Sequence, residues 1–211
     1  MSRDNILHRV RTALGRGAGQ AVADPPAVRI RIPEVHVETR IASFRVRLEE
    51  LSGTLHRVAS AEEARDFVAS AIADKSAVAS NAPYLAECGI SNLPGVRSGV
   101  TDRQELRELC ATVDFGISSA DYALADTGTL VMLSSPREAR MISLLPPAHI
   151  AVLPLDRMLT GLDELFTLHP CPSNETSSMV LITGPSRTAD IEQILVRGVH
   201  GPGQITVVVV G

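Results

Sequence analysis

Aromatic residues are scarce in this sequence. They make up 3% of its 211 residues, and tryptophan is absent. Proteins that bind single-stranded nucleic acid use aromatic rings as stacking platforms, so this scarcity argues against that function. The formal net charge of −4 gives no field that would attract DNA or an anionic membrane. The hydrophobic content of 45% is nevertheless sufficient for a sizeable core, built mostly from Val, Ile, Leu and Ala.

Long apolar runs are also missing. No stretch approaches the roughly 20 apolar residues that a membrane-spanning helix needs. The first 16 residues, MSRDNILHRVRTALGR, contain no continuous apolar segment of the kind found in signal peptides. We therefore expect a cytoplasmic protein without a membrane span.

Cysteines are few and far apart. Cys88, Cys110 and Cys171 form no C-x-x-C pair. This spacing excludes a sequence-local zinc or iron–sulfur motif, and we predict no metal site and no cofactor in this chain. Buried free thiols are the first interpretation, and one reactive thiol is the alternative.

The N-terminal region differs from the remainder. Apolar residues recur at helical spacing over residues 4–15, and a Gly- and Pro-containing linker follows. We predict two parts, namely an N-terminal helix with linker (1–35) and an α/β domain (36–211). A helix this short is marginal alone, so it docks either on its own core or on a partner. A second helix is predicted over residues 38–55.

Strand-like and helical segments alternate through the α/β domain, which predicts a mostly parallel sheet with helices on both sides. S-x-x-E at Ser60–Glu63 and T-x-x-Q at Thr101–Gln104 are typical of capping boxes at helix starts. The run ITVVVV near residue 210 is typical of a strand covered on both faces. Strands are predicted at residues 56–59, 76–80, 114–117, 129–133, 150–155 and 178–183.

Three local expectations follow. The strands at 114–117 and 129–133 are joined by a segment too short for a helical crossover, which predicts an antiparallel pair. Asp156 is expected to cap a helix with Met158, Leu159, Leu162 and Phe166 facing inward. His149, at the start of a strand after two prolines, is interpreted first as an edge residue and second as a catalyst.

The segment TGPSRTADIE predicts one binding site. The segment is predicted to run from a strand into a helix that begins after a short loop. The loop contains Gly184, Ser186, Arg187 and Thr188, and the helix has Ile191, Ile194 and Leu195 facing inward. This arrangement would place backbone N–H groups at the carboxyl edge of the sheet. A helix start of this kind binds carboxylate or phosphate, and Arg187 could add a bidentate contact. The alternative is that Ser186 or Thr188 merely caps the helix while Arg187 pairs with Asp190.

The segment GISSADYALADTGTL predicts a second set of ligand groups. It carries the carboxylates Asp121 and Asp126, and Thr127, Gly128 and Thr129 follow. Hydroxyl and carboxylate groups suit a polyol, ribose or hydroxy acid, and the two carboxylates could serve in acid–base catalysis. An ordered loop that satisfies its own backbone is the alternative. His200, in the Gly-rich turn GVHGPG, is a further catalytic candidate.

Three strings, GISSADYALADTGTLVMLSS, SLLPPAHIAVLP and LITGPSRTADIEQILVRGVHGPG, resemble the lactate-utilization protein C family of LUD-domain proteins. The resemblance extends over nearly the whole chain, but only the part after Asp114 is specific. It implies the three-layer α/β/α fold shared with sugar-phosphate isomerases and CoA transferases of the NagB/RpiA type. Asp126 stands before T-G-T, where family members commonly have Glu.

The resemblance implies a role in oxidation of L-lactate to pyruvate beside iron–sulfur and cysteine-rich partner subunits. The first functional hypothesis is therefore an accessory subunit that binds a small anionic ligand. The second is a stand-alone isomerase or CoA transferase that acts on a sugar phosphate or acyl group, with Asp126 as its nucleophile. The third is a structural or regulatory protein. Whether the isolated chain is an enzyme stays open at this point.

Overall fold

A computed structural model describes residues 2–17, 19–20, 32–189, 195–198 and 200–211. Its contacts divide the chain into two compact units, Met1–Arg31 and Ile32–Gly211. The first unit contains α1 (Arg3–Ala13), where Ser2 Oγ accepts a hydrogen bond from the Asn5 N–H at the helix start. α1 has no buried residue, and the apolar side chains of Ile6, Val10 and Leu14 are exposed. No helix in the described part of the chain is long and apolar enough to cross a membrane.

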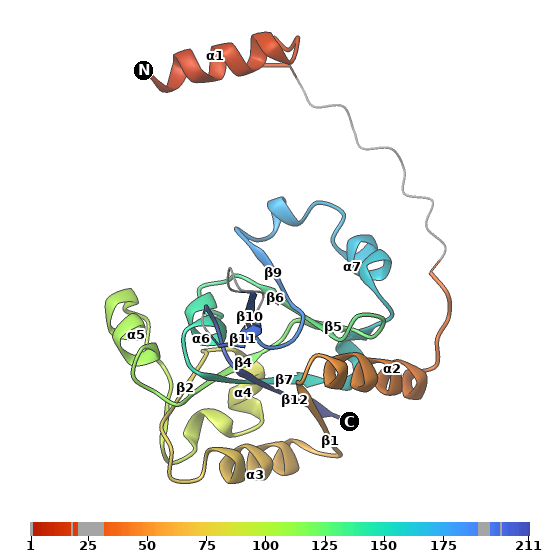
Figure 1. The fold of residues 1–211 in the computed structure, drawn as a ribbon, viewed down its shortest axis with the longest axis vertical. Coiled ribbons are helices and arrows are strands. Elements are labelled where there is room, and N and C mark those ends of the chain that lie inside the picture. The colour runs from red at the N-terminus through yellow and green to blue at the C-terminus, as the bar shows by residue number, and fades with distance from the viewer. Residues whose placement is uncertain (1, 18, 21–31, 190–194, 199) are drawn as a thin grey trace. The chain divides into compact units, whose positions relative to one another are not determined.

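The second unit is built on a six-stranded sheet in which each pair of neighbouring strands is parallel (Figure 1). In spatial order its strands are β1 (Thr54–Val58), β12 (Gln204–Val210), β7 (Ala148–Pro154), β4 (Phe115–Ser119), β2 (Ala77–Ala79) and β3 (Val96–Arg97). The predicted mostly parallel α/β architecture in three layers is confirmed.

Helices and a second sheet cover the two faces of this main sheet. One face packs against α3 (Ala61–Ile72) and α4 (Pro83–Glu87), and the other against α2 (Val37–Glu50) and the second sheet (Figure 1). The remaining helical segments are η1 (Ile90–Asn92), α5 (Arg103–Cys110), α6 (Arg140–Leu144), η2 (Leu155–Arg157), α7 (Leu162–Leu168) and η3 (Pro172–Asn174).

The second sheet has four strands, β8 (Met158–Leu159), β5 (Tyr122–Leu124), β6 (Thr129–Leu133) and β9 (Met179–Ile182). β5 follows β4 after two residues and forms an antiparallel hairpin with β6. The prediction that the strands near 114–117 and 129–133 pair with each other is therefore wrong. The three residues of β5 leave the main sheet and supply β6 with a different antiparallel partner.

β12 lies inside the main sheet, between the edge strand β1 and β7. Val207 and Val209 pack into the core on the side of α2, and Val208 packs on the side of α3. The prediction of a strand covered on both faces is confirmed. A continuous run of valines fits this position because both faces of the strand are apolar.

Gly116 of β4 allows α6 to lie directly on the main sheet. A Cβ at this position would overlap the carbonyl oxygen of Ile142, which belongs to α6. Since α6 follows the loop after β6, this close approach fixes where residues 134–139 run. That loop is the part of the fold that carries the site described below.

The helix starts agree only in part with the predictions. At α3, Ser60 Oγ accepts from the Glu63 N–H at 3.2 Å, as the capping box predicts. At α5 the cap is Asp102, one residue later than predicted, because its carboxylate accepts from the Glu105 N–H at 2.8 Å. The helix predicted from Asp156 is wrong. Met158 and Leu159 are buried as part of strand β8, and α7 begins only at Leu162.

Candidate functional site

The carboxyl ends of β2 and β4 carry a group of polar side chains. Ser80 directly follows β2, and Asp121 comes two residues after Ser119, the last residue of β4. The loop between β6 and α6 crosses this edge, because the Asn81 N–H donates to the Arg137 carbonyl oxygen at 2.9 Å. The crossing places Glu138 above the ends of two neighbouring strands. Ligands of open α/β sheets bind at such an edge.

Glu138 is buried, with 7% of its surface exposed. Its Oε2 accepts a hydrogen bond from Ser80 Oγ at 2.7 Å, whereas its Oε1 has no hydrogen-bond partner among the described residues. Burial raises the pKa of this carboxyl group from 4.5 to about 8; Ser80 and the Ser119 backbone oppose the rise, and Asp121 adds to it. At neutral pH Glu138 is therefore mostly protonated and can donate a hydrogen bond.

Asp121 is the second carboxyl group of the site. Burial raises its pKa, while the hydrogen bond that it accepts from the Leu133 N–H at 2.6 Å and the charge of Arg157 act in the opposite direction. Glu138 and Asp121 thus share a cavity but differ in environment. Two carboxyl groups in one cavity can act as acid and base.

The cavity that both carboxyl groups line has a volume of about 540 Å³. Tyr84, Ser119 and Arg137 also line it. Burial raises the pKa of the Tyr84 phenol, so this group stays a hydrogen-bond donor at neutral pH. We refer to this space as the Glu138 cavity. It combines two carboxyl groups, a phenol and two serine hydroxyls with one arginine.

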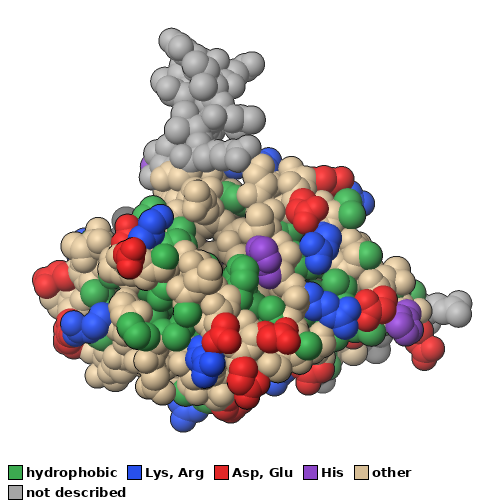
Figure 2. Space-filling model, turned by 90° about the horizontal axis from the view of Figure 1, so that it is seen from below, with side chains coloured by type: hydrophobic (Ala, Val, Ile, Leu, Met, Phe, Trp, Pro, Cys, Tyr) green, Lys and Arg blue, Asp and Glu red, His purple; other side chains and the backbone are tan. Residues whose placement is uncertain are grey.

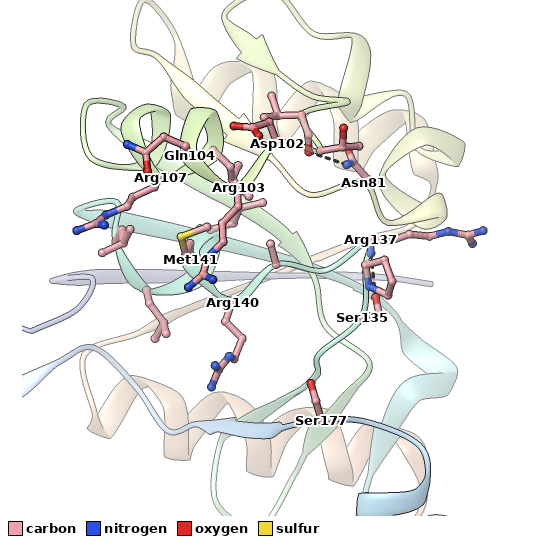
Figure 3. A pocket seen from close by; sticks show the side chains of 18 residues that line it. Asn81, Asp102, Arg103, Gln104, Arg107, Ser135, Arg137, Arg140, Met141 and Ser177 are labelled. Carbon is pink, nitrogen blue, oxygen red and sulfur yellow. Dashed lines mark hydrogen bonds between the residues drawn. The ribbon is translucent and has the colours of Figure 1, made fainter.

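A larger groove adjoins the Glu138 cavity. It has a volume of about 1250 Å³ and runs between α5 and α6 (Figure 3). Four arginines line it, namely Arg103, Arg107, Arg137 and Arg140. Ser135, Pro136 and Arg137 line both spaces, so the loop that carries Glu138 forms their common wall. We refer to this space as the arginine groove.

Comparison with known proteins assigns the family. The model of the LUD domain matches residues 41–210. The chain belongs to the LUD domain family. A protein of Halalkalibacterium halodurans named lactate utilization protein C is 32% identical over 99% of this chain and 97% of its own length. A protein of the same name from Oceanobacillus iheyensis is 33% identical over 64% of each chain.

A solved structure shares the fold of this LUD domain protein. The crystal structure of a DUF162 family protein from Deinococcus radiodurans superposes with a TM-score of 0.63. The superposition covers 84% of this chain and 100% of the Deinococcus radiodurans chain, and the two sequences are 19% identical. At this identity the likeness concerns the fold alone.

Of the site residues predicted from the sequence, one lines the Glu138 cavity, and the others lie outside it. Asp121 lines the Glu138 cavity. Asp126, Thr127 and Gly128 form the turn between β5 and β6, where Asp126 and Thr127 are exposed. Gly128 has φ +66° and lies against the backbone of α2, so that a Cβ there would come within 2.7 Å of the Leu48 nitrogen.

The two predicted segments do meet. Thr129 and Thr183 are joined by a hydrogen bond of 2.8 Å between their hydroxyl oxygens. Gly184 packs against Leu51, which follows α2, just as Gly128 packs against the end of α2 itself. The meeting point is thus covered by α2, and its residues line neither the Glu138 cavity nor the arginine groove.

The helix predicted after Gly184–Thr188 is wrong. Arg187–Ala189 form strand β10, which pairs antiparallel with β11 (Leu195–Arg197). Ile191 and Ile194, which suggested the helix, lie outside the described residues. Without a helix, the argument for an anion site at its N-terminus no longer holds. Ligand binding by Gly184, Ser186, Arg187 and Thr188 stays a prediction.

His200 is exposed, in a loop near the amino ends of the main-sheet strands. Gly203, three residues later, donates to the Pro147 carbonyl oxygen just before β7 begins. The Ser186 N–H donates to the Pro202 carbonyl oxygen in the same region. In a parallel sheet this end is opposite to the carboxyl edge. Asp126 and His200 as catalytic candidates likewise stay predictions.

His149 is the residue whose setting differs most from the expectation. It lies on the central strand β7 with 1% of its surface exposed and is not an edge residue. Its Nε2 is 2.6 Å from Ser118 Oγ, and its Nδ1 has no partner among the described residues. Burial lowers its pKa to about 4, so His149 is neutral at physiological pH. This buried pair lines neither cavity.

Glu138 was missed because it lies in a short polar loop, SSPREAR, that has no motif spacing. The one signal in the sequence was its position. The loop directly follows an apolar strand, and strand ends carry the ligand groups in α/β folds. What the sequence alone could not supply is that this loop folds back over the end of β2, where Ser80 is 58 residues earlier in the chain than Glu138.

Proposed function

We propose that this LUD domain protein serves in lactate utilization by binding a 2-hydroxy or 2-oxo carboxylate in the Glu138 cavity. The observation that carries the proposal is the buried, protonated Glu138 with one carboxyl oxygen unpartnered, in a cavity shared with Asp121. The names of relatives such as the Halalkalibacterium halodurans protein support the choice of ligand.

Each group of the cavity has a role in this proposal. Protonated Glu138 donates a hydrogen bond to the ligand's carbonyl or hydroxyl oxygen, and the Tyr84 phenol supplies a second donor. Arg137, at the wall of the cavity, offers charge-assisted hydrogen bonds to the carboxylate. Asp121 stays close to the ligand as the group that accepts a proton.

Oxidation of lactate to pyruvate releases two electrons and two protons. In the proposal, iron–sulfur and cysteine-rich partner subunits accept the electrons. The Glu138 cavity binds the hydroxy acid, and its side chains take up the protons. Among the described residues there is no group of three or more His, Cys, Asp or Glu side chains that could hold a metal ion. The protein is thus proposed as a subunit that acts together with its partners.

A second candidate function rests on the same pair of carboxyl groups. Glu138 and Asp121 in one cavity could move protons on a bound sugar phosphate or acyl compound without any redox partner, as a stand-alone isomerase or transferase. A CoA transferase mechanism that uses Asp126 as nucleophile receives no support from geometry, because Asp126 is exposed on a turn outside both cavities.

The pH dependence of pyruvate binding tests the proposal. Because Glu138 ionises at about pH 8, the wild-type affinity for pyruvate should fall above that pH, by up to about tenfold per pH unit. The variant Glu138→Gln cannot ionise and should show no such fall. Calorimetric titrations from pH 6 to 9.5 measure both, with Glu108→Gln on α5 as the exposed control.

Two outcomes would contradict the proposal. The ligand assignment fails if neither pyruvate nor lactate binds the wild-type protein, or if the wild-type affinity does not change with pH. The role as a partner-dependent subunit fails if the isolated protein oxidises lactate with an artificial electron acceptor. Co-purification with iron–sulfur subunits from the native host supports that role.

A further inference from the structure

The arginine groove has an unusual charge for this protein. The chain as a whole has a net charge of −4, whereas the groove is lined by four arginines and only one acidic residue, Asp102. The Asp102 carboxylate is already engaged, because it accepts the hydrogen bond from the Glu105 N–H that begins α5. The groove is therefore a local region of positive charge.

Six arginines outside the groove form ion pairs with carboxylates. Arg40, Arg45 and Arg47 of α2 each lie within 4 Å of a glutamate, and the same holds for Arg57 and Arg97, while Arg65 pairs with Asp66. The face seen in Figure 2 likewise shows basic and acidic side chains close together. None of the four groove arginines forms such a pair within the described part of the chain.

In Figure 3 the side chains of Arg103 and Arg140 extend in a similar direction, whereas that of Arg107 points to the left. Arg103 extends from α5 toward α6, and Arg140 extends from the start of α6 toward Ser177 (Figure 3). Arg107 follows Arg103 by one helical turn, which places both on the same face of α5. Arg137 points away from the other three (Figure 3). Arg103 and Arg107 place like charges on one face of α5, and a bound anion would reduce their repulsion.

The shape of the groove indicates the size of the ligand. Its volume of about 1250 Å³ exceeds the range of roughly 300–1,000 Å³ found for drug-sized ligands, so a three-carbon acid would fill little of it. The half-exposed side chains of Leu144 and Leu145 add an apolar surface beside the arginines. A ligand with several negative charges and an apolar part matches both features.

We propose that the arginine groove binds the di- or polyphosphate group of a small-molecule ligand, through Arg103, Arg107 and Arg140. Guanidinium groups hold phosphate oxygens with paired, charge-assisted hydrogen bonds. The wall formed by Ser135, Pro136 and Arg137 is shared with the Glu138 cavity, so the other end of this ligand reaches the site of the proposed carboxylate. Only this last point rests on the proposed function.

Pyrophosphate is the probe that tests the groove. Calorimetric titration into the wild-type protein should show binding that weakens with added salt. Removing one guanidinium group should weaken binding by about tenfold or more, so Arg103→Gln combined with Arg107→Gln should weaken it by about 100-fold. Arg140→Gln should weaken it by about tenfold. The matched control Arg65→Gln removes an exposed arginine of α3 and should change the affinity less than about twofold.

Several results would overturn this inference. It fails if pyrophosphate does not bind, if Arg65→Gln weakens binding as much as the groove variants do, or if a glutamate-rich peptide binds where pyrophosphate does not. Pyruvate is titrated in parallel to separate the two proposals. Pyruvate binding without pyrophosphate binding refutes the groove and leaves the proposed function intact, whereas the reverse result refutes the proposed function alone.

Discussion

Replacing Glu138 by glutamine should make the protein more stable, and more so as the pH rises. Below pH 4.5 the carboxyl group is protonated in both the folded and the unfolded chain, so it contributes nothing to the pH dependence. Between pH 4.5 and about 8 the unfolded chain releases the proton while the folded protein retains it. The folded state then binds more protons, and the free energy of unfolding falls as the pH rises.

The magnitude follows from the two pKa values. The difference between 4.5 in the unfolded chain and about 8 in the folded protein corresponds to about 5 kcal/mol of lost stability above pH 8. Because glutamine does not titrate, the variant escapes this loss. Its advantage over the wild type should therefore grow by about 4 kcal/mol between pH 5 and pH 9.

Urea denaturation followed by far-UV circular dichroism suits this measurement, since the sequence has no tryptophan to report by fluorescence. The comparison of two chains at each pH removes the contributions that both share, including that of His149. Glu108→Gln, on the exposed side of α5, controls for the loss of one negative charge. Parallel stability profiles of wild type and Glu138→Gln from pH 5 to 9 would refute the reasoning, because they would mean that burial does not shift the titration of Glu138.

Two further predictions concern other parts of the fold. Burial lowers the pKa of His149 to about 4 in the folded protein, whereas the unfolded chain takes up the same proton near pH 6.5. The free energy of unfolding should therefore fall by about 3 kcal/mol as the pH falls from 6.5 to 4. In urea titrations at pH 4–7, the variant His149→Leu should lose that part of the acid sensitivity. Gly116→Ala should destabilise the protein by about 2 kcal/mol or more, because the added methyl group overlaps the Ile142 carbonyl oxygen and displaces α6 from the sheet. Thermal denaturation checks the second prediction, and an unchanged midpoint would show that α6 does not lie on β4 as described.

The architecture could be predicted from local patterns because it depends on them. The valine run of β12, the S-x-x-E box of α3 and the alternation of strands and helices each determine their own element. The strand pairing was predicted wrongly where one segment contributes strands to two different sheets. The segment near 114–133 forms part of two sheets, and that division depends on β7, β8 and β9, which are remote in sequence.

The candidate site was predicted only in part for a related reason. Asp121 was identified because it lies in a segment dense in polar residues, and the same density drew attention to Asp126 and Thr127, which form a tight turn against α2. Glu138 depends on a contact between its loop and Asn81, far away in the chain. Burial, which gives Glu138 its altered proton affinity, is a property of that tertiary contact and has no counterpart in local sequence.

The position of β12 also bears on how the protein folds. β1 pairs only with β12 among the described strands, and their facing residues Thr54 and Thr206 are 152 positions apart. During synthesis β1 therefore emerges long before its partner strand exists, and β7 is exposed on the same side until then. Pairings of such high sequence separation make folding slow, since a long loop must close before they form. The main sheet completes late, and a partially made chain presents two open strand edges that favour association with other chains.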